Sequence, residues 1–263
     1  MSISSETILC FRVLNSGLST CLDEILFRLR DGSSPFYLVC ANPHTLEVAK
    51  KDSLFCKAIE NADLVVPDGI GIVFASHVLG GKIRQRITGS DIFWEVNKLL
   101  NNEHTYSCFF LGATENTLHR IRERMSIDFP NVRVVGTFSP PFKEEFAEDE
   151  NDVMVEAVNR ANPDILWVGM TAPKQEKWIY ENRERLQAKF VGAIGAVFDF
   201  FAGTKKRSNS WFQDCGLEWL PRLVREPRRL WRRNLVSSPM FFARVISHRM
   251  KYVGNRSGRQ NPY

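Results

Sequence analysis

The chain has 263 residues, of which 44% are hydrophobic and 25% are charged, a composition typical of a globular protein with a sizeable core. Six scattered cysteines without a C-x-x-C pair, and no recognisable signal peptide, favour free thiols in a reducing cytoplasm over a disulfide framework or a zinc site. The longest apolar run, residues 190–203, is short and contains Asp199, so no segment is expected to span a membrane.

The charge is distributed unevenly along the chain. The net charge is +5, but residues 204–263 hold 14 Lys and Arg against 3 Asp and Glu, whereas residues 1–203 hold 21 against 27. We therefore expect two parts, a core at 1–203 and a basic appendage at 204–263. Such an appendage is typical of proteins that meet an anionic partner, either a membrane surface or nucleic acid.

Apolar runs alternate with helical patterns, which predicts an α/β fold with a doubly wound, mostly parallel sheet and helices on both faces. Strands are expected at residues 8–14, 36–40, 64–66, 107–113, 132–136, 164–170 and 189–195. Helices are expected at residues 21–29, from about 44, at 72–79, 91–101, from about 114, at 143–161 and around 178. The acidic helix at 143–161 is expected to be a solvated outer face. Residues 138–142 are expected to form a loop, because two adjacent prolines do not fit inside a strand or helix.

Polar residues follow three of these strands. Asn42 follows the strand expected at 36–40, and the sequence Asp68-Gly69-Ile70-Gly71 follows the strand at 64–66. The sequence Pro173-Lys174-Gln175-Glu176 follows the strand at 164–170. Because the carboxyl ends of parallel strands meet at one edge of the sheet, these side chains are expected to converge. Plainer explanations remain open at this point, since Asn and Asp often cap helices and glycines often only make turns.

A group of cations follows the acid closely, at Lys82, Arg84 and Arg86. One acid beside several cations suits a reaction that removes a proton and releases a phosphate. The alternative is a solvated basic loop.

Several common sites are excluded by their missing motifs. No strand is followed by G-x-G-x-x-G with an acid about 20 residues later, and no Walker A loop is present. No H-E-x-x-H or His/Cys cluster suggests a metal, and the five histidines are dispersed.

Longer motifs carry a resemblance to a known family. These motifs are ANPH, ADLVVPDGIG, RITGSD, VGMTAPKQEKW, AIGAVFDFFAGTKKRS and GLEWLPRLVREPRRLWRR. In this order, from about residue 8 to residue 235, they resemble the WecG/TagA/CpsF family of bacterial glycosyltransferases. The resemblance implies transfer of a sugar from a nucleotide diphosphate to a lipid-diphosphate-linked sugar at the cytoplasmic membrane face. It also implies inversion at the anomeric carbon, no catalytic metal and no cofactor.

The resemblance also suggests roles for individual residues. Asp68 matches the proposed general base, and Arg86 matches an arginine proposed to act on the diphosphate. Asn42 and Gln175 match residues that line the pocket. Gly69 and Gly71 beside the acid, and Lys174 beside the glutamine, complete the expected substrate-binding set. The candidates for a tail arginine that reaches the site are Arg222, Arg229 and Arg232.

The chain departs from the family pattern at three places. Cys40 stands where many members have threonine, and Thr171 replaces a frequent glycine. Residues 208–210 read Ser-Asn-Ser where Ala-Pro is more usual. These departures bear on substrate choice more than on the class of reaction.

The tail at residues 211–252 is expected to form amphipathic helices. Pro227 is expected to start a second helix. On one side of the tail lie the apolar residues Leu220, Leu223, Val224, Leu230, Trp231 and Leu235, followed by the apolar residues of 240–246. Apolar and Trp residues flanked by arginines are typical of a helix at an anionic membrane surface. The alternative is a helix that packs on its own core and exposes a basic face.

The sequence therefore predicts an inverting, metal-independent glycosyltransferase that uses a UDP-sugar and a polyprenyl-diphosphate-linked sugar acceptor. It is expected to be cytoplasmic and peripherally bound to the inner membrane face, without a nucleic-acid partner. Two alternatives remain, a nucleic-acid-binding α/β protein that uses the basic tail and a catalytically silent scaffold that binds nucleotide sugars. The transferred sugar, the acceptor glycan and the formation of homo-oligomers are left open.

Overall fold

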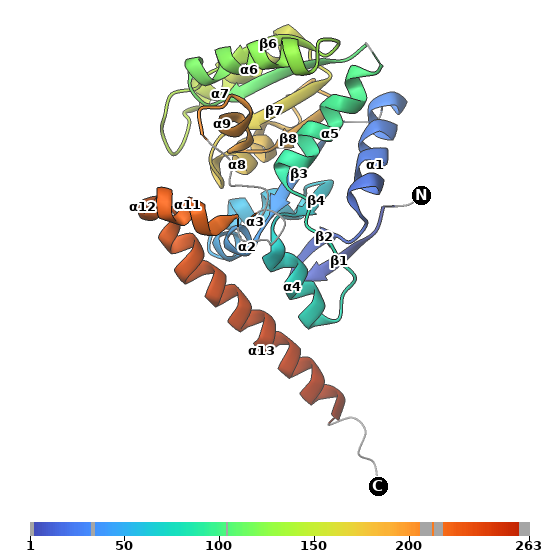
Figure 1. Ribbon diagram of the computed structural model, residues 1–263, viewed down its shortest axis with the longest axis vertical. Helices are drawn as coiled ribbons and strands as arrows, with labels where there is room; N and C mark the ends of the chain where they lie inside the picture. Colours follow the sequence, from blue (N-terminus) through green and yellow to red (C-terminus); the bar gives the residue numbers. More distant parts are fainter. Residues whose placement is uncertain (1–2, 33–34, 104, 206–211, 213–217, 258–263) are drawn as a thin grey trace.

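The computed structural model describes residues 3–32, 35–103, 105–205, 212 and 218–257. Its centre is a six-stranded sheet in the order β4-β3-β8-β7-β5-β6, in which all strand pairs are parallel (Figure 1). Residues of the four central strands, β3, β8, β7 and β5, are almost all buried, as expected for a sheet covered on both faces. The strands are β3 (Phe36–Ala41), β4 (Leu64–Pro67), β5 (Ser107–Gly112), β6 (Arg133–Phe138), β7 (Ile165–Gly169) and β8 (Phe190–Ala193).

Helices cover both faces of the sheet and bury two separate clusters of apolar side chains. One face carries α1 (Leu18–Asp31), α5 (Gly89–Asn101), α6 (Glu115–Asp128) and α9 (Val197–Phe201). The other carries α2 (Pro43–Ala49), α3 (Ser53–Glu60), α4 (Ile70–Leu79), α7 (Glu148–Ala161) and α8 (Lys174–Asn182). The prediction of a doubly wound α/β fold is confirmed. The strands of this sheet also begin and end within two residues of the predicted positions.

The N-terminal segment differs from its prediction. Residues 8–14 do not form one strand; instead β1 (Ser5–Ile8) and β2 (Phe11–Leu14) form an antiparallel hairpin. Leu9 makes the turn with a left-handed φ of 58°. Because neither Gly, Pro nor Asn marks this turn, sequence patterns could not reveal it.

Two helical predictions also need correction. The acidic helix begins at Glu148 rather than residue 143, with the Glu150 carboxylate accepting from the backbone N–H of Ala147 at 2.8 Å. Met154 and Val158 of this helix are fully buried, so it is not a wholly solvated face. Helix α3 was not predicted, although the Asp52 side chain caps it by accepting from the Phe55 N–H at 3.0 Å.

The tail forms α11 (Trp219–Arg225), α12 (Pro227–Trp231), a π-helical segment η1 (Arg232–Ser237) and α13 (Ser238–Ser257). Pro227 is the first residue of α12, as predicted. Helix α13 lies along α2 and α4, and its last turns extend beyond the body of the molecule (Figure 1). Among the described residues, no helix combines the length and apolar character needed to cross a membrane.

Contacts of α13 with the core are apolar and ionic. Phe241 and Val245 are fully buried in the same cluster as Ile72 of α4. Arg244 Nε lies 3.3 Å from Oε1 of Glu47, a carboxylate on α2 that is itself buried. This part of the tail therefore packs on its own core, which was the alternative to a purely interfacial helix.

Candidate active site

The predicted acid and asparagine meet at the carboxyl edge of the sheet. Asp68 follows β4, and its backbone N–H donates to the carbonyl of Ala41, the last residue of the neighbouring β3, at 2.8 Å. Asn42 follows β3 directly, and its Nδ2 donates to Asp68 Oδ2 at 3.3 Å. The convergence inferred from the topology is thus observed for this pair.

Asn42 performs the capping role as well. Its Oδ1 accepts from the Thr45 N–H at 3.1 Å and caps α2. Because the oxygen of the amide is held by the cap, the amide nitrogen is turned toward Asp68. The cap and the functional explanation are therefore compatible for Asn42.

The two glycines of the Asp-Gly-Ile-Gly turn have separate structural reasons. Gly69 is the N-cap of α4 and has a φ of 94°, which disfavours any residue with a side chain. The capping position therefore belongs to Gly69 and not to Asp68. At Gly71, a Cβ would lie 2.4 Å from Pro43 Cγ and 3.3 Å from Phe242 Cζ. Gly71 thus lets the acid-bearing turn approach both α2 and the tail helix α13.

Arg86 belongs to a segment that is fastened to the same strand end. The N–H of the next residue, Ile87, donates to the Pro67 carbonyl at the end of β4, at 2.9 Å. Lys82 and Arg84 are exposed, whereas the Arg86 side chain is only 23% exposed and its Nη1 lies 3.8 Å from Glu218 Oε2. Arg86 is therefore the most shielded from solvent of these three cations, and the residue that follows it is bonded to the residue that precedes Asp68.

The Thr-Gly-Ser-Asp sequence after Arg86 is explained by structure. Thr88 and Asp91 form a capping box at the start of α5, with bonds of 3.2 and 2.8 Å between side chains and backbone N–H groups. A Cβ at Gly89 would lie 3.4 Å from both Cys40 Sγ and the Ile194 carbonyl oxygen. This motif therefore holds α5 against the ends of β3 and β8.

Gln175 and its neighbour Glu176 lie buried at the start of α8. Their side chains are 4% and 1% exposed, and Gln175 Nε2 donates to Glu176 Oε1 at 2.8 Å. A Cβ at Gly195, just after β8, would lie 3.5 Å from the Gln175 amide. Gln175 is thus near the carboxyl end of β8, on the edge that carries Asp68.

Glu176 is a feature of this edge that sequence reasoning missed. Burial raises the pKa of Glu176 to about 7. Burial also raises the pKa of the Cys40 thiol, with further contributions from the carboxylates of Asp68, Glu176 and Asp91. The available signal was a glutamate on the apolar side of a helix that buries Trp178 and Ile179.

Lys174 is directed toward a different part of the structure. Its Nζ donates to the Lys143 carbonyl at 2.7 Å and lies 5.0 Å from the ring centre of Phe146. Burial lowers the pKa of this ammonium group. Lys174, the first residue of α8, thus directs its ammonium group toward the loop between β6 and α7 and not toward Asp68.

The tail arginines are placed only in part. Arg232 is exposed, and its guanidinium lies 5.4 Å from the ring centre of its neighbour Trp231. Arg222 and Arg229 belong to α11 and α12, and their side chains lie outside the described residues. Within the described part of the chain, no group of three or more His, Cys, Asp or Glu could hold a metal ion.

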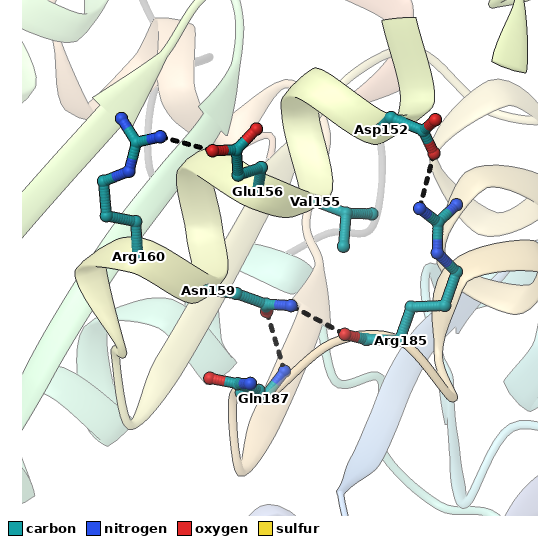
Figure 2. A pocket seen from close by; sticks show the side chains of 7 residues that line it. All are labelled: Asp152, Val155, Glu156, Asn159, Arg160, Arg185 and Gln187. Atoms are coloured by element: carbon teal, nitrogen blue, oxygen red, sulfur yellow. Dashed lines mark hydrogen bonds and ion pairs between the residues drawn. The ribbon is translucent and has the colours of Figure 1, made fainter. Parts of the chain in front are cut away.

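A surface hollow lies at the opposite edge of the sheet. Its polar side chains bind one another: Asp152 pairs with Arg185 at 2.5 Å, and Asn159 donates to the Arg185 carbonyl at 2.7 Å (Figure 2). The hollow lies between α7 and the segment that enters β8, which places it at the amino ends of the strands. It therefore does not belong to the site around Asp68.

The fold brings an acid and an amide into contact at the carboxyl ends of two parallel strands, which is the edge where α/β enzymes bind their ligands. The family model described as "Glycosyl transferase WecG/TagA/CpsF family" matches residues 6–254, and the chain belongs to this family. The predicted family is confirmed, and the chain is a glycosyltransferase.

Several curated relatives are similar over most of their length. The chain is 28% identical over 244 residues to an enzyme of Bacillus subtilis, covering 93% of this chain and 92% of the relative. It is 29% identical over 237 residues to an enzyme of Bacillus spizizenii, covering 89% and 88%. It is 28% identical over 225 residues to an enzyme of Staphylococcus aureus, covering 86% and 85%. All three are named N-acetylglucosaminyldiphosphoundecaprenol N-acetyl-beta-D-mannosaminyltransferase.

Proposed function

We propose that the chain transfers a sugar from a UDP-sugar to a polyprenyl-diphosphate-linked sugar, with inversion at the anomeric carbon, in the synthesis of a surface polysaccharide or teichoic-acid-type polymer. The names of the relatives support N-acetylmannosamine as the sugar and undecaprenyl-diphosphate-linked N-acetylglucosamine as the acceptor. The observation that carries the proposal is the contact between Asn42 and Asp68 beside the segment that bears Arg86. Of the three functions considered from the sequence, the family supports this one.

In the proposed reaction, Asp68 removes the proton from the acceptor hydroxyl as the oxygen attacks the anomeric carbon. Attack comes from the face opposite the diphosphate, which inverts the configuration. The Asn42 amide donates to Asp68 Oδ2 and fixes the orientation of the carboxylate. The Arg86 guanidinium stabilises the charge that develops on the departing UDP through a planar pair of N–H donors.

The tail supports peripheral binding to the cytoplasmic face of the membrane. Several of its apolar residues stay exposed, among them Val224 at 75% and Leu235 at 62%. Arginines alternate with them along α11, α12 and η1. Aromatic and apolar side chains flanked by cations suit the headgroup region of an anionic bilayer. A lipid-linked acceptor would be reached from this position.

The test is a transfer assay with the full-length protein. Purified enzyme is incubated with synthetic polyprenyl-diphospho-N-acetylglucosamine and a panel of UDP-sugars that includes UDP-N-acetylmannosamine. Mass spectrometry of the lipid product is expected to show the addition of one N-acetylhexosamine, and NMR is expected to show the inverted linkage. The Asp68→Asn variant is the control for background transfer. The absence of product with every donor in the panel would refute the proposal.

A further inference from the structure

The two described carboxylates of the basic tail form ion pairs with cations near the carboxyl edge of the sheet. The tail contains three acids, Asp214, Glu218 and Glu226, of which the structure describes the last two. Glu218 Oε2 lies 3.8 Å from Arg86 Nη1. Glu226 Oε1 lies 3.7 Å from Nζ of Lys205, in the turn after α9. In a segment crowded with arginines, both described acids thus pair with cations outside the tail helices.

The pair between Arg86 and Glu218 is the better shielded of the two. Its side chains are 23% and 18% exposed, whereas those of Lys205 and Glu226 are 40% and 33% exposed. Solvent and salt weaken an ion pair less when the charges are partly buried. We therefore expect the Arg86–Glu218 contact to be the stronger of the two ion pairs.

This pair lies beside the proposed catalytic acid. Ile87, next to Arg86, is bonded to the Pro67 carbonyl, and Pro67 precedes Asp68. Glu218 therefore holds its carboxylate on the cation that we assign to the donor diphosphate.

A carboxylate and a phosphate bind a guanidinium through the same planar N–H donors. A diphosphate on Arg86 would bring several negative oxygens next to Glu218, and like charges at this range repel each other. The two anions therefore compete for the same cation.

We propose that the Glu218 carboxylate occupies Arg86 in place of the donor's diphosphate when no donor is bound. A nucleoside diphosphate then displaces Glu218 from Arg86. This inference rests on the proposed function, since it assigns Arg86 to a UDP-sugar. Glu218 thereby sets the affinity for the donor and links diphosphate binding to the start of α11.

The displacement involves only the beginning of the tail. Helix α13 stays docked through buried Phe241 and Val245 and through the pair between Arg244 and Glu47. Helix α11 begins one residue after Glu218 and exposes most of its apolar residues. A shift of α11 therefore costs little buried surface.

The experiment measures UDP binding by isothermal titration calorimetry with the full-length protein. Glu218→Gln removes the competing charge and keeps the size of the side chain, so UDP should bind about twofold to fivefold more tightly than to the wild type, as expected for a partly exposed pair. The matched control is Glu156→Gln, which removes a glutamate that pairs with Arg160 at the opposite edge (Figure 2). This control should bind UDP with wild-type affinity.

A double-variant cycle assigns the gain to the pair. In an Arg86→Gln background, Glu218→Gln should no longer tighten UDP binding. Unchanged or weaker binding of UDP by Glu218→Gln overturns the exchange and leaves the proposed transfer reaction standing. An equal gain in the Arg86→Gln background also overturns it. A failure of all variants, including the wild type, to bind UDP overturns both the exchange and the proposed donor.

Discussion

Glu176 gives a prediction that can be worked out from the structure. Its carboxyl is 1% exposed, and burial raises its pKa to about 7 from an ordinary value of 4.5. A difference of this size corresponds to about 3 kcal/mol in the free energy of unfolding. The folded protein keeps the proton up to about pH 7, whereas the unfolded chain releases it near pH 4.5. The stability contributed by the protonated carboxyl is therefore fully present below pH 4.5 and is lost as the pH rises through 7.

The perturbation is Glu176→Gln, which has a similar shape and no charge. Its amide oxygen can still accept from Gln175 Nε2, as the carboxylate does at 2.8 Å. The new amide N–H groups can remain unbonded, which costs about 1–3 kcal/mol at every pH. The absolute stability is therefore a poor measure, and the slope with pH is the quantity to compare.

The assay is urea denaturation of both proteins between pH 4.5 and 8. The variant should gain about 3 kcal/mol relative to the wild type across this range. Glu181→Gln, which changes an exposed glutamate near the end of the same helix, is the control and should follow the wild type. Parallel curves for Glu176→Gln and the wild type would refute the argument.

Three further predictions concern catalysis and membrane binding. Asp68→Asn should retain UDP binding but lose about 10²–10⁴-fold in turnover, and near-wild-type transfer would remove Asp68 from the mechanism. Arg86→Lys should stay impaired in the transfer assay, because a point charge lacks the planar fork, and full activity would contradict that role. Val224→Asp combined with Leu235→Asp should reduce sedimentation with anionic liposomes, whereas Val153→Asp, at an exposed position on α7, should not. Equal sedimentation of all three proteins would remove these tail residues from membrane binding.

Much of the sheet could be predicted because its strands are covered on both faces. Strands such as Phe36–Ala41 then read as continuous apolar runs that stand out from the surrounding polar sequence. The N-terminal hairpin was missed because its turn at Leu9 and Cys10 contains no typical turn residue. Here tertiary contacts, and not local preference, fix the turn.

The site was predictable to the extent that topology decides it. Asn42 and Asp68 follow adjacent parallel strands, so their proximity follows from the strand order alone. The position of the Lys174 ammonium group does not follow from the strand order, because its partner is the carbonyl of Lys143, some 30 residues away in a loop. The burial of Glu176 likewise depends on packing of α8 that no local pattern specifies.

The structure changes how the tail has to be tested. Deleting the chain from about residue 211 would remove Phe241 and Val245, which are fully buried, and would uncover Ile72 beneath them. Loss of one buried phenylalanine side chain commonly costs about 3–5 kcal/mol, a large fraction of the stability of most domains. A truncated protein that fails to bind membranes could thus fail because it is unfolded.

The same docking brings the tail to the turn that carries the proposed catalytic acid. Phe242 packs against Gly71 in the turn that carries Asp68, so α13 forms part of the wall that positions the acid. The first part of the tail instead pairs with Arg86 and exposes apolar residues of α11. A loss of activity on deletion would therefore combine three effects: lost stability, a displaced acid and lost membrane contact. Substitutions on the exposed face alone separate the last effect from the other two, because they leave Phe241, Phe242 and Val245 in place.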